Sequence, residues 1–248
     1  MSKAVAIHQP NYIPWTSYFL KAYLSDVFVF HDSVAFSKGT PTRRCGVLKP
    51  NSKNGESDFL ALPIASGQEG MPIKDILLSD HFDWTTKHLA LLQNTYRKAP
   101  FYKPVYEMIV PAMMALKNEK NMCVINAQLI KAIFSFLEIK CTTIFSSQMP
   151  ALVGKNHALN LAILKQLDAT IYVSGKGASS YQDEIELANN GIKVIYSDWK
   201  KFADANDFLK QNAPYSTGLS VIDTLFWIGK EQLIAFFEAY KINEIIGK

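Results

Sequence analysis

Two histidines near the start of the chain each close a short apolar run and stand beside a second polar side chain. His8 precedes Gln9 after residues 4–7, and His31 precedes Asp32 after residues 27–30. An imidazole titrates near neutral pH and can act as a general acid, a general base or a phosphate contact. His8 is therefore a candidate acid or base, with Asp32 as a carboxylate that orients a catalytic partner. A hydrogen bond to a neighbouring loop is the alternative for each histidine.

A glycine-containing segment begins at Ser174 and Gly175 and reads Ser-Gly-Lys-Gly-Ala-Ser-Ser through Ser180. It joins an apolar run to a helical pattern, and its glycines would let backbone N–H groups approach a phosphate or carboxylate. The segment has only the first two glycines of G-x-G-x-x-G and no Walker spacing. Ser180 with Asp183 also fits an ordinary helix cap, so an anion cradle and a cap both stay open.

Basic and aromatic residues between these two regions supply further candidates. Lys38 and Arg44 flank a turn and could face a phosphate or carboxylate of a substrate, although exposed charges on a hairpin are commonly only solvated. His88 lies on a helical stripe with Trp84 and Tyr96, where it could act as an acid or base in a cleft or be an ordinary core histidine.

The elements that must position these residues alternate between strand and helix. Apolar runs predict strands at 3–8, 27–30, 142–145, 170–173 and 192–196, and helical spacing predicts helices at 15–25, 158–167 and 181–189. This alternation predicts an α/β fold with a doubly wound, mostly parallel five-stranded sheet of the Rossmann-like or nucleotidylyltransferase-like kind. Ligands bind such sheets outside the carboxyl ends of the strands, which is where His8, Asp32 and the segment from Ser174 are expected.

The long stretch from about 32 to 140 is predicted to be an insertion with structure of its own. It should contain a hairpin with strands at 44–48 and 58–62, followed by helices at 84–98, 104–116 and 121–137. A helical part is expected at 204–248, with a break at 214–216 and further helix after it. Because no linker marks a boundary, we expect one domain over residues 1–248.

Composition narrows the class of protein. The chain has 248 residues, of which 48% are hydrophobic and 19% charged, so disorder is excluded. A net charge of +4 without a basic stripe argues against nucleic acid as a partner. No apolar run approaches the roughly 20 residues of a membrane span, and the start lacks a signal peptide, so we expect a cytoplasmic protein. The three cysteines show no CxxC spacing and predict no metal site.

Several segments, in order along nearly the whole chain, resemble the WbqC-like protein family. They are His8–Trp15 with Tyr18–Phe19, Asp26–Asp32, Phe36–Lys38, Trp84–His88, Tyr96–Pro100, Tyr172–Gly175 with Tyr181, and Leu219–Phe226. The resemblance implies a bacterial protein of surface-polysaccharide and O-antigen gene clusters. Apart from the resemblance, Gln9 follows the first predicted strand, and Tyr12 and Tyr181 could stack on sugar or base faces, so these three are candidate substrate contacts.

This chain departs from the family pattern after the second predicted strand. Ser33 and Ala35 replace an acid and an amide of Asp-Asp-Val-Gln, and Arg43 and Cys45 stand where the family tends to have Asn-Arg-Asn. Gln9-Pro10 is also similar to the Q-P-x-H-x-G-H segment of nucleotidylyltransferases, but Tyr12 and Trp15 replace its two histidines.

These observations favour an enzyme of surface-polysaccharide biosynthesis, a transferase or ATP-dependent ligase. It would transfer an acyl, aminoacyl or nucleotidyl group to a sugar intermediate and take a sugar nucleotide or acyl donor as its small-molecule partner. The alternative is a non-catalytic nucleotide-sugar-binding or adaptor protein of the same pathway. The sequence leaves the cofactor open; a nucleotide with Mg²⁺ would fit. It also leaves the oligomeric state open.

Overall fold

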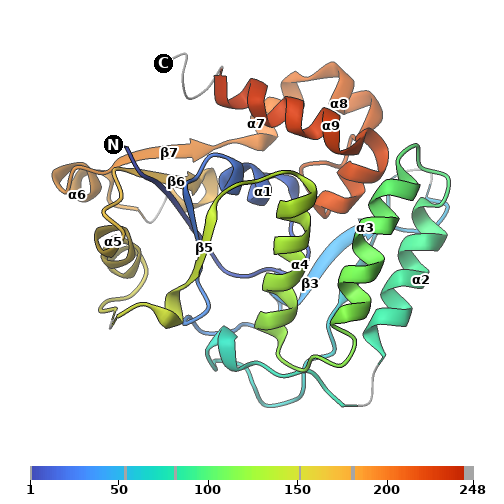
Figure 1. Cartoon of the computed structure of the whole chain (residues 1–248), viewed down its shortest axis with the longest axis horizontal. Coiled ribbons are helices and arrows are strands. Elements are labelled where there is room, and N and C mark those ends of the chain that lie inside the picture. Colours follow the sequence, from blue (N-terminus) through green and yellow to red (C-terminus); the bar gives the residue numbers. More distant parts are fainter. Residues whose placement is uncertain (1, 53–54, 81–82, 151, 180–181, 243–248) are drawn as a thin grey trace.

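Five parallel strands form the central sheet of the computed structural model, which describes residues 2–52, 55–80, 83–150, 152–179 and 182–242 (Figure 1). The strands are β1 (Ala4–His8), β2 (Val27–Phe30), β5 (Thr142–Phe145), β6 (Ile171–Gly175) and β7 (Lys193–Ser197), in the order β5-β2-β1-β6-β7. Each neighbouring pair is parallel, with β1 between β2 and β6. The predicted α/β fold is confirmed, and the sheet is parallel throughout.

Helices cover both faces of this sheet (Figure 1). On one face, Val5 and Ile7 pack with residues of α5 (His157–Gln166) and α6 (Glu184–Asn189). On the other face, Ala6 and Phe28 pack with α1 (Thr16–Tyr23), α4 (Met122–Phe136) and α9 (Val221–Lys241). Successive strand residues point to opposite faces, so strands covered on both sides must be apolar throughout. This is why they stood out in the sequence as short continuous runs.

The stretch after β2 contains the expected hairpin and helices. Strands β3 (Arg44–Leu48) and β4 (Ser57–Ala61) pair antiparallel, with Arg44 opposite Ala61. A short 3-10 helix, η1 (Ile73–Asp75), precedes α2 (Trp84–Tyr96) and α3 (Tyr102–Ala115). Helix α4 then returns the chain to the sheet through β5, so it serves as the crossover between β2 and β5.

The C-terminal part is more divided than predicted. Helix α7 (Trp199–Ala205) begins before residue 204, α8 (Asp207–Asn212) follows it, and α9 comes after the turn at 214–219. Polar caps explain the divisions, because Asp198, Asn206 and Ser220 each accept a hydrogen bond from a backbone N–H of the helix that they precede. Two further 3-10 helices, η2 (Ser146–Gln148) and η3 (Lys176–Ala178), extend from β5 and β6.

Candidate functional site

A cavity of about 430 Å³ opens at the carboxyl ends of β1 and β6, in the middle of the sheet. The chain leaves β1 towards β2 and leaves β6 towards β7, in opposite directions along the sheet. Loops diverge at such a point and leave a crevice that parallel α/β sheets use for ligands. We call it the strand-end cavity. Its lining residues include His8, Trp15, Lys21, Gly175, Gly177 and Trp199.

His8 closes β1 and packs edge-on against two aromatic rings. The centroid of its ring lies 4.7 Å from that of Tyr18 and 5.7 Å from that of Trp15. Its Nδ1 lies 3.1 Å from the carbonyl oxygen of Gln9, which can only accept a hydrogen bond, so Nδ1 carries the proton of the neutral ring. Burial, followed by the charge of Lys21, holds the pKa of His8 well below 6.5. The ring is therefore neutral at pH 7, and Nε2 keeps the lone pair that a base needs.

Lys21 is the most unusual charged residue of this cavity. Its side chain extends from the last turn of α1, is only 5% exposed, and places Nζ 5.9 Å from the centre of the Tyr18 ring. Among the described residues, no carboxylate lies within ion-pair distance of it. Burial lowers the pKa of Lys21 from 10.5 to about 7. A buried cation is stable only beside an opposite charge, and an anionic ligand in the cavity could provide it.

A tryptophan and two glycines also line the strand-end cavity. The indole N–H of Trp199 is buried and has no acceptor among the described residues. Gly175 and Gly177 line the same cavity, and a Cβ atom built at either would meet no heavy atom within 4 Å. The cavity thus offers an unobstructed stretch of main chain to a ligand, and the buried Trp199 lies beside it.

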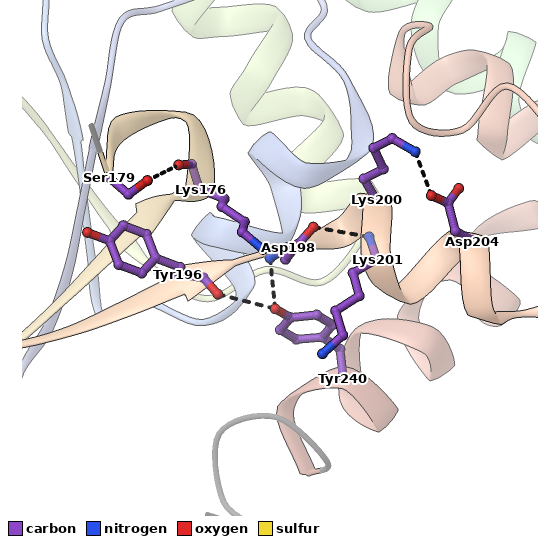
Figure 2. A network of polar contacts seen from close by, with 8 residues as sticks. All are labelled: Lys176, Ser179, Tyr196, Asp198, Lys200, Lys201, Asp204 and Tyr240. Atoms are coloured by element: carbon purple, nitrogen blue, oxygen red, sulfur yellow. Dashed lines mark hydrogen bonds and ion pairs between the residues drawn. The ribbon is translucent and has the colours of Figure 1, made fainter. Parts of the chain in front are cut away.

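The loop after β6 is tied to the start of α7 by the network in Figure 2. Lys176 Nζ donates to Asp198 Oδ2 at 2.9 Å, and the Lys201 backbone N–H donates to Asp198 Oδ1 at 3.0 Å. Burial raises the pKa of Asp198, but these two hydrogen bonds outweigh it and the pKa stays below its usual value. The Asp198 N–H donates to the Tyr240 hydroxyl, which donates in turn to the Tyr196 carbonyl oxygen. Asp198 pairs with Lys176, and Asp204 pairs with Lys200, the third lysine that lines the cavity. Of these three lysines, Lys21 alone has no carboxylate partner among the described residues.

A second cavity of about 200 Å³ lies on the other side of Trp15, which lines both. The β3–β4 hairpin and the turn before α9 enclose it, and we call it the hairpin cavity. Its lining residues include Tyr12, Trp15, Arg44, Phe59, Leu219 and Ser220. The Arg44 guanidinium lies 4.4 Å from the centre of the Phe59 ring.

The sequence candidates are divided among several places. Gln9, Ser174 and Gly175 join His8 in the strand-end cavity, where the Ser174 hydroxyl accepts a hydrogen bond from Gln182 Nε2 at 2.7 Å. Tyr12 and Arg44 line the hairpin cavity instead. The Tyr181 prediction lies outside the described residues.

Asp32 is 2% exposed and holds the turn after β5 in place. Its carboxylate accepts hydrogen bonds from the Ser146 hydroxyl at 3.0 Å, the Ser147 N–H at 2.9 Å and the Ser147 hydroxyl at 2.6 Å. These contacts make it a structural anchor of the strand ends. His31, beside it, lies 3.2 Å from the Ser146 hydroxyl and lines a separate hollow with Asn160.

His88 and Lys38 line neither cavity. His88 is buried, its Nδ1 lies 2.7 Å from the Tyr12 hydroxyl, and burial lowers its pKa to about 4. Its ring also packs edge-on against Trp84. Lys38 is exposed on the surface of the insertion. The four basic candidates His8, His88, Lys38 and Arg44 are thus not gathered at one site.

Sequence reasoning missed Lys21 and Trp199. Lys21 follows Tyr18 by three residues, so it shares the buried face of α1, and a lone lysine on an apolar helical stripe was the available signal. Trp199 follows the last strand of the sheet, and the rule that selected residues after the other strand ends would have found it.

Two further properties of the described residues concern metal ions and membranes. No group of three or more His, Cys, Asp or Glu side chains is arranged there to hold a metal ion. Of the helices in these ranges, none combines the length and apolar character that crossing a bilayer requires.

Comparison with known proteins gives the family. No solved structure matches the chain. An "Uncharacterized protein Rv1507c" of Mycobacterium tuberculosis (strain ATCC 25618 / H37Rv) is 27% identical over 230 residues, which is 92% of this chain and 95% of that protein. The model of the WbqC-like protein family matches residues 9–235, from the loop after β1 to the second half of α9. The chain therefore belongs to the WbqC-like protein family.

Proposed function

We propose that this protein is a cytoplasmic transferase of bacterial surface-polysaccharide biosynthesis that binds a phosphate-bearing ligand in the strand-end cavity. The observation that carries the proposal is Lys21, a buried lysine without a carboxylate partner among the described residues, at the sheet position where α/β proteins bind ligands. Sugar nucleotides, nucleoside triphosphates and acyl-CoA donors all carry phosphate.

The other residues that line the strand-end cavity also suit a phosphate-bearing ligand. Phosphate oxygens accept hydrogen bonds from backbone N–H groups. The open main chain at Gly175 and Gly177 allows close approach. A volume of about 430 Å³ falls in the range of small-molecule sites.

His8 supplies the chemistry of the proposed transfer. Its neutral ring keeps a lone pair on Nε2, because Nδ1–H is directed to the Gln9 carbonyl oxygen. Nε2 would accept the proton of a sugar hydroxyl or amine as that group attacks the acyl carbon or phosphorus of the donor, while the bond to the leaving group breaks. Lys21 would hold the phosphate that orients the donor.

A second candidate function is non-catalytic binding of a nucleotide-sugar. The observation that favours it is the dispersal of His8, His88, Lys38 and Arg44 over separate parts of the molecule. The two functions share the ligand site and differ only in whether His8 reacts.

The test is ligand binding followed by turnover. Nucleotides with Mg²⁺, sugar nucleotides and acyl-CoA donors are screened by thermal denaturation, where a ligand at 100 times its Kd adds about 2.7 kcal/mol. Lys21→Met should abolish the shift, and exposed Lys38→Gln should not change it. Gly177→Leu should also weaken it, because Gly177 lines the cavity and a bulky side chain there would obstruct the main chain that a ligand approaches.

The role of His8 in turnover can then be tested separately from ligand binding. We expect His8→Gln to keep the thermal shift and lose turnover, and His88→Gln, at a residue that does not line the cavity, to keep both. Binding without turnover in any donor and acceptor pair would support the non-catalytic function. A wild-type protein that is insensitive to all phosphate-bearing compounds would refute both.

A further inference from the structure

The hairpin cavity has a wall whose arrangement is set by strand pairing. In the β3–β4 register, Gly46 lies opposite Phe59 and Arg44 lies opposite Ala61, so Arg44 and Phe59 are diagonal neighbours. Cys45 and Leu60, the alternate residues, are buried beneath the hairpin. The Arg44 guanidinium is thereby held 4.4 Å from the centre of the Phe59 ring.

Three glycines line the hairpin cavity, and the absence of a side chain at each leaves space there. A Cβ atom at Gly46 would lie 3.2 Å from the Leu219 side chain, which fills that space from the turn before α9. Gly39 and Gly218 also line the cavity, and a Cβ at either would meet nothing within 4 Å. Phe59 as a whole residue remains 51% exposed, which is unusual for a phenylalanine.

The charge of the hairpin cavity comes from one residue. Arg44 is the only formally charged side chain among the described residues that line it, and no carboxylate of those residues pairs with it. The start of α9 offers no free donor here, because Val221 N–H donates to the Pro14 carbonyl and Ile222 N–H to the Ser220 hydroxyl. A single positive charge matches a carboxylate, which a guanidinium can bind through two parallel hydrogen bonds.

The volume of the hairpin cavity and its aromatic surface narrow the class of ligand further. About 200 Å³ is below the range of drug-sized sites and suits one sugar residue better than a nucleotide. Phe59 and Trp15 offer ring surfaces for the apolar face of a sugar. We propose that the hairpin cavity is a second substrate subsite that binds an acidic sugar of uronic-acid type, with Arg44 on its carboxylate and Phe59 against its ring.

The position of Trp15 connects the two subsites. Trp15 lines both cavities, and its ring packs against His8, with centroids 5.7 Å apart. Its indole N–H donates to the Ser17 hydroxyl at 2.7 Å, which fixes the ring. The inference rests on the proposed function, since it makes the acidic sugar the acceptor and the strand-end ligand the donor. His8 then lies at the boundary where a proton must leave the acceptor.

Direct binding tests the subsite without turnover. Isothermal titration of the full chain with galacturonate and glucuronate should show binding, and galactose and glucose should bind at least about tenfold more weakly. Arg44→Gln and Phe59→Ala should each weaken uronate binding about tenfold or more. Arg97→Gln, an exposed arginine that lines neither cavity, is the matched control and should bind as the wild type does.

A crossed experiment separates this proposal from the proposed function. Uridine diphosphate is the probe of the strand-end cavity, and its binding should be lost in Lys21→Met and kept in Arg44→Gln. Prior saturation with uridine diphosphate should leave uronate binding in place. Absence of uronate binding, equal binding of neutral sugars, or competition between the two probes would overturn the acidic-sugar subsite. If the wild-type protein binds uronate but does not bind uridine diphosphate, the result would count against the proposed function and leave the subsite supported.

Discussion

Replacement of Lys21 by methionine should stabilise the protein, by an amount that depends on pH. Methionine keeps an unbranched side chain of similar length in the buried position but cannot carry a charge. The wild-type lysine must lose its proton or remain charged in an apolar environment, and burial lowers its pKa from 10.5 to about 7. The unfolded chain has no such restriction, so folding of the wild type is linked to proton release.

The magnitude follows from the two pKa values. Above pH 10.5 the amine is neutral in both states and the linkage is absent. As the pH falls from 10.5 to 7, the unfolded state takes up a proton that the folded state does not, and the free energy of unfolding decreases by about 1.4 kcal/mol per pH unit. Below pH 7 the cost is constant at about 5 kcal/mol. The advantage of Lys21→Met should therefore be about 4 kcal/mol at pH 7 and about 1 kcal/mol at pH 10.

Urea denaturation of wild type and Lys21→Met at each pH from 7 to 10 measures this difference, in which other titrating groups cancel. Lys140→Met, at an exposed lysine, is the control and should show the same small effect at every pH. A Lys21→Met advantage that stays constant between pH 7 and pH 10 would refute the reasoning, because it would mean that Lys21 keeps an ordinary pKa in the folded protein.

Three further changes test other parts of the structure by urea denaturation. Burial raises the pKa of Asp223 to about 7, so wild-type stability should fall as the pH rises from about 4 to 7, and Asp223→Asn should remove this loss of about 4 kcal/mol. Gly229, inside α9, has a non-helical backbone with φ of 75°, and a new Cβ there would lie 2.6 Å from the Phe101 ring, so Gly229→Ala should cost about 2–4 kcal/mol. An effect below about 1 kcal/mol would contradict this backbone geometry. Asp32→Ala should cost about 1–3 kcal/mol by leaving the Ser147 donors without an acceptor, and an unchanged midpoint would argue against its role as an anchor.

Much of the fold could be predicted from the sequence. The strands at 27–30, 44–48 and 142–145 have the predicted bounds, and α2, α3 and α4 begin and end within two residues of expectation. Doubly covered strands are short apolar runs, and helix periodicity and caps are also local features of sequence. The break at 214–216 does separate α8 from α9, but the start of α7 and its division from α8 were missed because Asp198 and Asn206 act as caps within a stretch of weak periodicity.

The candidate site could be predicted only in outline. The rule for parallel sheets correctly indicated the strand ends as the place of a cavity, and His8, Gln9, Ser174 and Gly175 do line one. The sequence could not show that His88 would be buried against Trp84 and Tyr12, because a histidine on an apolar stripe fits a cleft and a core equally well. Nor could it show that the hairpin would carry Arg44 to a different cavity.

The sequence by itself thus determined the α/β class, the strands and the edge of the sheet at which polar residues gather, because each depends on side chains close together in the chain. Only the tertiary structure decided which of these residues share a cavity. Lys21 is a routine helical lysine until α1 is packed between the sheet and the C-terminal helices, and it then becomes a buried cation beside His8. Desolvation and proximity arise between elements that are far apart in the sequence, so they are properties of the packed molecule.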